Sequence, residues 1–235
     1  KNVDVANLDD DDFFGSGVSL NGAGDRLAVG AERDAGAGNA GGGGAAYLFS
    51  FTDTDFNGGT LESTIGSGYT GGKNLDVVNS DNGESFGSSV SLNGAGDRLA
   101  VGAEDDEGIG NNSLIVGAAY LFSFTDTDFN GGTLESILGK GYTGGKNVDV
   151  TNLEPGDRFG TSVSLNGAGD RFAVGASFDS GARNTGGSTG AVYLFSFSSN
   201  GPLSPSMADF SENAGGDSEV LTADIEALLD AGTDV

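Results

Sequence analysis

The sequence predicts an all-β chain built from three blade-like sheets, and three observations support this prediction. The stretch SVSLNGAGDRLAVGA, residues 89–103, returns almost unchanged at residues 17–31 and 162–176. In each copy apolar and polar residues alternate on both sides of an Asn-Gly turn, which is the pattern of a β-hairpin. No helical period occurs within the repeat. With 235 residues, 36% of them hydrophobic, the chain can also bury a core.

The repeat is about 72 residues long, because the opening KNVDV returns as KNLDV at residues 73–77 and as KNVDV at residues 146–150. A period this long suits one blade-sized sheet better than a helical solenoid unit. We therefore expect repeats at residues 1–72, 73–145 and 146–200, followed by a linker and short helix at residues 201–235.

Each repeat is expected to hold four short antiparallel strands, and the second repeat shows them in order. They are predicted at residues 88–93, 98–103, 117–124 and 133–138. The middle two strands, LAVGA and AAYLFSF, are apolar on both faces. Each sheet therefore needs a neighbour above and below, as stacked blades have.

Composition excludes several classes of function. The net charge is -25, from 35 acidic and 10 basic residues, so nucleic acid is a poor partner. The absence of cysteine and histidine removes thiolate and imidazole metal sites and the common nucleophile pairs. No apolar run approaches the roughly 18 residues of a membrane span, so we expect no membrane insertion. Without a signal peptide or an initiator methionine, the sequence is expected to be a piece of a longer polypeptide.

The start and end of the predicted hairpin carry a family resemblance. Phe86-Gly87 heads its first strand and Val101-Gly102-Ala103 ends its second. This pattern resembles the FG-GAP repeat of integrin α-subunit β-propellers, and its bacterial variant most closely. The resemblance implies one propeller blade per repeat, usually seven in a closed ring, in surface or extracellular proteins. Three repeats are too few to close a ring, so we expect an incomplete ring or part of a larger array.

The resemblance also implies a calcium loop between the first two strands, but this sequence departs from it there. The loop is NGAGDR, which in the second repeat keeps only Asn93 and Asp97 as oxygen ligands. Calcium prefers 6–8 oxygens. We therefore expect a local turn at this position.

A better calcium candidate is the hairpin tip TDTDFNGG in the first two repeats. Alternate oxygens of a DxDxNG loop can converge on calcium, and the glycine permits the sharp bend. Position 12 lacks the usual acid, and a glutamate at position 10 is the substitute. The candidate ligands are Asp53, Asp55, Asn57, Glu62, Asp126, Asp128, Asn130 and Glu135. Plain turn chemistry is the alternative, because the third repeat keeps Asn200-Gly201 without the aspartates.

Two further sets of loops are candidates for binding. The acidic turns before each Phe-Gly are a second possible ion site, and the loops between the second and third strands differ enough to form a recognition surface. Both sets could equally be solvated connections. The turns are residues 9–12, 79–84 and 154–157, and the loops are residues 32–44, 104–116 and 177–190.

A helical pattern follows at residues 221–232, where Thr222 can cap the start and Gly232 the end. The phrase LTADIEALLDAGTDV resembles a segment of large secreted bacterial haemagglutinin-like proteins.

These features favour a non-catalytic adhesion or ligand-binding module, extracellular or at a cell surface, in a larger secreted bacterial protein. It would bind a protein or glycan, with calcium stiffening the tips. The alternative is a structural subunit of a fibre or surface layer that associates with itself through open blade faces. A carbohydrate-active enzyme platform is less favoured, because the carboxylates lie in turns where water keeps them ionised.

Overall fold

A computed structural model describes residues 3, 5–6, 8–37, 43–77, 83–109, 115–180, 188–197 and 206–209. Strands make up all the regular secondary structure of these residues, and they form three separate sheets. The prediction of an all-β chain of three blade-like sheets is confirmed. The predicted helix at residues 221–232 and the haemagglutinin-like segment lie outside the described residues.

The first two sheets share one topology, with four antiparallel strands and a short fifth strand parallel to the fourth. The first sheet holds β1 (Phe14–Leu20), β2 (Arg26–Ala31), β3 (Ala45–Ser50), β4 (Thr60–Gly66) and β5 (Leu75–Asp76). The second holds β6 (Phe86–Leu92), β7 (Arg98–Ala103), β8 (Ala118–Ser123), β9 (Thr133–Gly139) and β10 (Val148–Asp149). The fifth strand comes from the KNLDV or KNVDV segment that opens the next repeat. We did not predict it, because two residues are too few to show an alternating pattern.

The third sheet contains β11 (Phe159–Leu165), β12 (Arg171–Ala176), β13 (Ala191–Ser196) and β14 (Ser206–Asp209). β14 pairs antiparallel with β13, with Tyr193 opposite Asp209. The fourth strand of this sheet therefore comes from a segment for which the sequence predicts a linker.

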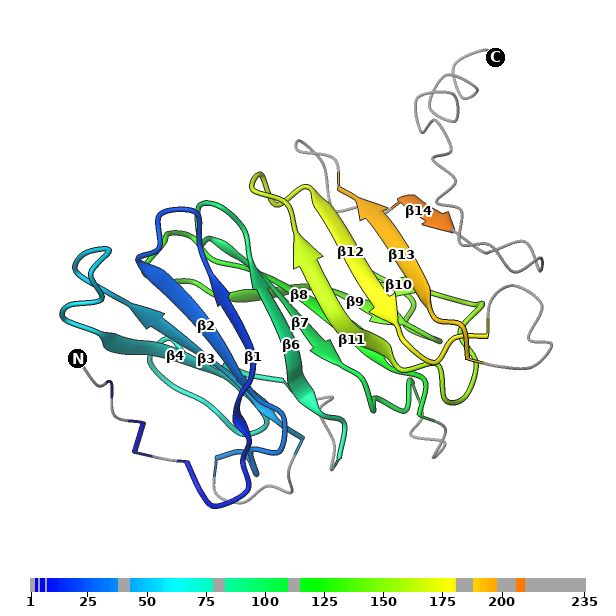
Figure 1. Cartoon of the computed structure of the whole chain (residues 1–235), viewed down its shortest axis with the longest axis horizontal. Helices are drawn as coiled ribbons and strands as arrows, with labels where there is room; N and C mark the ends of the chain where they lie inside the picture. The colour runs from blue at the N-terminus through cyan, green and yellow to red at the C-terminus, as the bar shows by residue number, and fades with distance from the viewer. Residues whose placement is uncertain are drawn as a thin grey trace, which may run out of the picture.

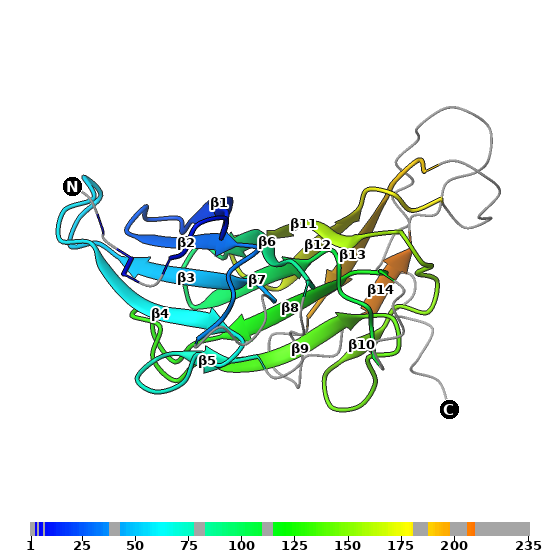
Figure 2. The ribbon, with the colours of Figure 1, turned by 90° about the horizontal axis from the view of Figure 1, so that it is seen from below.

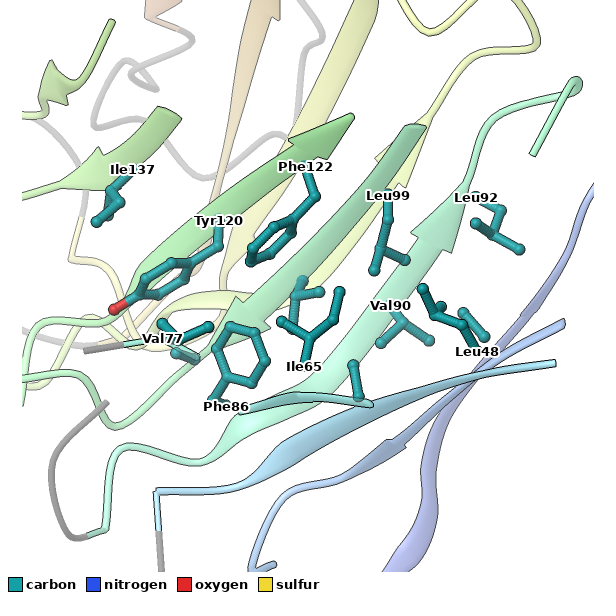
Figure 3. Close-up of a cluster of buried hydrophobic side chains, with 14 of the residues drawn as sticks. Leu48, Ile65, Val77, Phe86, Val90, Leu92, Leu99, Tyr120, Phe122 and Ile137 are labelled. Atoms are coloured by element: carbon teal, nitrogen blue, oxygen red, sulfur yellow. The ribbon is translucent and has the colours of Figure 1, made fainter. Parts of the chain in front are cut away.

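The three sheets pack face to face in a row, and their first strands β1, β6 and β11 lie side by side (Figures 1 and 2). Figure 3 shows the core between the first two sheets, where Leu48 and Ile65 meet Phe86, Val90 and Leu92. The second and third sheets enclose an equivalent cluster that includes Leu121, Leu138 and Phe159. Burying one such side chain contributes about 1.5–3 kcal/mol. Stacking against a neighbour is therefore what stabilises each sheet.

The glycines of the Phe-Gly and Val-Gly-Ala signatures allow the sheets to approach each other closely. A Cβ at Gly102 would lie 2.0 Å from the carbonyl oxygen of Gly160, and one at Gly30 would lie 1.8 Å from that of Gly87. Gly87 and Gly160 also have positive φ values of 94° and 95°, at a bulge in the first strand. Both signatures therefore serve the contact between neighbouring sheets.

The NGAGDR loops are tight turns, as predicted. The side-chain oxygen of Asn93 accepts hydrogen bonds from the backbone N–H groups of Gly96, Asp97 and Arg98 at 2.9–3.1 Å. Its amide nitrogen donates to Asp97 Oδ1 at 2.7 Å. The two oxygen ligands that remain from the family's calcium loop are thus used to close the turn.

Candidate functional site

The two hairpin tips are closed by their own hydrogen bonds. Asp126 Oδ1 accepts from the backbone N–H groups of Asp128 and Asn130 at 3.0 and 3.2 Å. The Asn130 side-chain amide donates to Asp126 Oδ2 at 2.8 Å, and this bond lowers the pKa of Asp126. In the first repeat, Asp53, Asp55 and Asn57 form the same arrangement. The structure therefore brings an aspartate and an asparagine of each tip together, in the geometry of a hairpin turn.

The two glutamates predicted to complete these tips lie in ion pairs on the neighbouring strands. Glu62, on β4, accepts from Ser50 Oγ and Lys73 Nζ, each at 2.5 Å. Glu135, on β9, has equivalent partners. Burial raises the pKa of Glu62, but the hydrogen bonds from Lys73 and Ser50 outweigh this effect and leave the pKa lowered. Within the described ranges, no three acidic side chains gather as a metal-binding group. Calcium at the tips stays a prediction.

The tip of the second repeat docks on the first sheet. Arg26 donates to the backbone oxygen of Thr127 at 2.5 Å and to Asp128 Oδ1 at 2.8 Å. Lys73 Nζ donates to the backbone oxygen of Asp128 at 2.6 Å. Phe129 at this tip is fully buried, whereas the equivalent Phe56 of the first tip is 42% exposed. Asp128 thus connects neighbouring sheets, a role that the sequence analysis missed although an arginine recurs at the position of Arg26.

A buried aspartate anchors each loop between the second and third strands. Asp106 is fully buried and accepts hydrogen bonds from the hydroxyls of Tyr120 and Tyr142 at 2.8 and 2.9 Å. It also accepts from the Gly108 N–H at 2.7 Å. Burial raises the pKa of Asp106 above its ordinary value. The equivalent aspartates, each hydrogen-bonded to a tyrosine hydroxyl, are Asp34 and Asp179. This cluster was not predicted from the sequence, although each Val-Gly-Ala is followed three residues later by an aspartate and two residues further on by a glycine. The tyrosines that enclose Asp106 lie 14 and 36 residues away, so only the folded chain brings them to it.

These anchored loops present apolar side chains to solvent. Ile109 is 54% exposed and Phe178 is 50% exposed, in the loops that follow β7 and β12. The Arg158 guanidinium lies over the Phe178 ring, 5.3 Å from its centre. Residues 38–42, 110–114 and 181–187 of the three loops lie outside the described residues.

Two of the acidic turns before Phe-Gly share one arrangement. Asp12 accepts from the Asp9 N–H at 2.6 Å, and Asp157 accepts from the Glu154 N–H at 2.6 Å. Both side chains are buried, and burial raises the pKa of each. These aspartates therefore close their own turns. In the second repeat, residues 79–82 of the turn lie outside the described residues.

The two ends of the row of sheets expose apolar faces. We call the outer surface of the first sheet around Phe14, Val18 and Leu20 the head face; these side chains are 41%, 66% and 46% exposed. Their counterparts in β6, Phe86, Val90 and Leu92, are 7% exposed or less. We call the outer surface of the third sheet around Ala173, Val192 and Leu194 the tail face. Val192 is 52% exposed, whereas its counterparts Ala46 and Ala119 are fully buried.

Comparison with known proteins confirms the family resemblance in the third repeat. Residues 151–195 match the sequence profile of the FG-GAP repeat. Such repeats typically occur in extracellular or surface proteins and are generally non-enzymatic. No curated protein matches the chain. Its fold is similar to the crystal structure of Saccharomyces cerevisiae Sqt1, with a TM-score of 0.45 and 12% identity over 85% of this chain. The chain spans 36% of that protein's length. Among the described residues, no helix is long and apolar enough to cross a membrane.

Proposed function

We propose that the chain is a non-catalytic binding module of an extracellular or cell-surface protein, and that its loops contact a protein or glycan partner. The observation that carries this proposal is the pair of exposed apolar side chains, Ile109 and Phe178, on loops held by the buried Asp106 and Asp179. Binding residues are found disproportionately on loops that a rigid scaffold positions. The match to the FG-GAP repeat supports the surface location.

A non-catalytic role is supported by the environment of the buried acids. Asp106 and Asp157 have raised pKa values because they are buried, which is a property that general acids share. Yet Asp106 is enclosed by two tyrosine hydroxyls and a backbone N–H, and Asp157 accepts from its own turn. Their hydrogen bonds thus hold the loops and turns of the fold.

A binding experiment tests the proposal. The chain would be applied to arrays of glycans and of extracellular protein domains, beside the double variant Ile109→Ser/Phe178→Ser. A control, Leu134→Ser, changes an exposed leucine on β9 that is 38% exposed. We expect the chain and the control to bind the same ligand and the double variant to lose most of that binding. Equal binding by all three proteins, or no ligand on either array, would contradict the proposal.

Calcium at the tips is a separate part of the proposal and needs its own test. It is supported by the alternating oxygens of Asp53 and Asp55 and by the positive φ of Gly58, 58°, which lets the tip bend. In the second tip, Arg26 and Lys73 contact Asp128, and these two cations disfavour calcium there. Calorimetric titration with calcium should show binding that Asp53→Asn/Asp55→Asn removes and Asp126→Asn/Asp128→Asn retains. Absence of heat, with identical melting in calcium and chelator, would overturn this part.

A structural subunit of a fibre or surface layer is the second candidate, and the apolar head and tail faces favour it. Soluble monomers rarely expose contiguous apolar faces without a partner. The two candidates are compatible, because Ile109 and Phe178 lie in loops and not on either end face.

A further inference from the structure

The two contacts between sheets inside the chain are built in the same way. The Leu92 N–H donates to Ser19 Oγ at 2.9 Å, and the Leu165 N–H donates to Ser91 Oγ at 2.9 Å. At the hairpin turns, the Gly22 N–H donates to the Gly94 oxygen and the Gly94 N–H to the Gly167 oxygen, both at 3.0 Å. Each sheet therefore offers one set of groups to the sheet before it and a different set to the sheet after it.

The head and tail faces correspond to the two sides of this repeated contact, and within the described residues no further sheet packs against either of them. A Cβ at Gly87 would lie 2.4 Å from the Ala45 oxygen of the preceding sheet, but one at the equivalent Gly15 would have no described atom within 4 Å. A Cβ at Gly102 would meet Gly160 of the following sheet, whereas the three atoms nearest to one at Gly175 all belong to Ser162 of its own sheet. Both end faces thus keep the glycines that allow close approach.

Polar groups at the two ends repeat the pattern as well. Inside the chain, Arg26 of the first sheet bonds to Asp128 in the tip of the second. The counterpart of Arg26 at the tail is Arg171, whose side chain is 61% exposed. The counterpart of Asp128 at the head is Asp55, next to the half-exposed Phe56. Charges of opposite sign therefore stand at matching places on the two ends.

We propose that the tail face of one copy of this chain packs against the head face of a second copy, repeating the contact already present twice within each chain. Val192 and Leu194 would cover Phe14, Val18 and Leu20 of the second copy, and its Asp55 would accept from Arg171. Such a contact is heterologous, so it either closes a ring or continues as a filament. Two copies supply six sheets, which lies within the usual range of about four to eight blades for a closed propeller.

The charge of the chain predicts how salt affects this association. Each copy carries a net charge of -25, so two copies repel each other at low ionic strength. Salt screens this repulsion over distances beyond roughly 10 Å at 0.1 M, while it leaves apolar contact intact. We therefore expect the association to strengthen as salt is added.

Sedimentation of two end-face variants tests the proposal. Val18→Asp blocks the head face and Val192→Asp blocks the tail face, at positions where the added charge stays exposed in the single chain. Leu134→Asp, on β9 at a residue that is 38% exposed, is the control. The unchanged chain and the control should associate reversibly. Each end-face variant alone should sediment as a monomer, and their equimolar mixture should form dimers, because one still has a free tail face and the other a free head face.

The other outcomes overturn the proposal. A chain that stays monomeric at high salt and high concentration has no such contact. If only one of the two variants loses association, the contact is symmetric. If neither the mixture nor the single variants form dimers, the head face does not match the tail face. If Val192→Asp fails to fold, Gly175→Ala replaces it, since this methyl group adds bulk to the tail face without a charge. If Val18→Asp fails to fold, Val18→Ser replaces it on the head face. If the loop variant Ile109→Ser/Phe178→Ser keeps its ligand binding, that result contradicts the proposed function and leaves the association of copies unaffected.

Discussion

Replacement of Gly102 by alanine should separate the second and third sheets. The new Cβ would lie 2.0 Å from the Gly160 oxygen and 3.0 Å from its carbon, so the obstacle is backbone that cannot rotate away. Reaching an ordinary contact of 3.4 Å requires a displacement of about 1.4 Å. This exceeds the gap of roughly 0.5–1 Å that already forfeits about a quarter to a half of the dispersion energy between facing atoms. Overpacking a core costs about 1–3 kcal/mol, and a backbone obstacle belongs at the upper end of that range.

The unfolded state partly offsets this cost. Alanine restricts the unfolded chain, which stabilises the folded state by about 0.4–1 kcal/mol where the native φ is negative, as it is at Gly102. We therefore expect a net loss of about 2 kcal/mol in the free energy of unfolding. Urea unfolding at a concentration where the chain is monomeric measures it.

Gly175→Ala is the matched control for this measurement. Gly175 occupies the same position in the third sheet, but the atoms nearest to its Cβ belong to the Ser162 side chain, which can adopt another rotamer. Its free energy of unfolding should change by less than about 1 kcal/mol. If Gly102→Ala and Gly175→Ala unfold at the same urea concentration, close backbone approach is not what the glycine provides.

Three further predictions concern charged groups. Burial raises the pKa of Asp106, so the folded state binds this proton more tightly than the unfolded state, and stability falls as pH rises from 3.8 through the raised folded-state pKa. Asp106→Asn should flatten that part of the pH–melting curve; an unchanged slope would contradict the reasoning. The pKa of Glu62 is lowered by its lysine and serine partners, so its contribution is present above the unfolded value of 4.5 and lost as pH falls through the folded-state pKa. Glu62→Gln should cost about 1 kcal/mol at neutral pH and nothing in acid, as measured by urea unfolding. Arg26→Ala should raise hydrogen exchange at residues 125–132, whereas Arg171→Ala should leave that tip unchanged; equal exchange in both variants would refute the docking of the tip.

The fold was largely predictable from the sequence because the features that specify it are local. The hairpin of residues 89–103 depends on alternating side chains and on Asn93, whose partners lie three to five residues away. The two-residue β5 was not predictable, because it lies in the segment that opens the second repeat but pairs with β4 of the first repeat. The strand Ser206–Asp209 was missed for a similar reason. The residues around it in the sequence are typical of a linker, and its strand pairing with β13 appears only in the folded sheet.

The candidate site was less predictable, because its decisive contacts join distant residues. Glu62 and Glu135 stand at plausible spacing for calcium, but their lysine partners 11 residues away engage them in the folded chain. In the sequence, Asp106 is one of many acidic residues in loops. Its role depends on the hydrogen bond from Tyr142, which lies 36 residues later.

The sequence by itself determined the all-β class, the number of repeats and the tight turns, since each follows from residues close together in the chain. Only the tertiary structure decided which apolar faces find a partner. The head and tail faces carry nearly the same residues as the faces buried between sheets, so no local pattern distinguishes them. Their exposure follows from their places at the two ends of the row, where no neighbouring sheet within the described chain covers them.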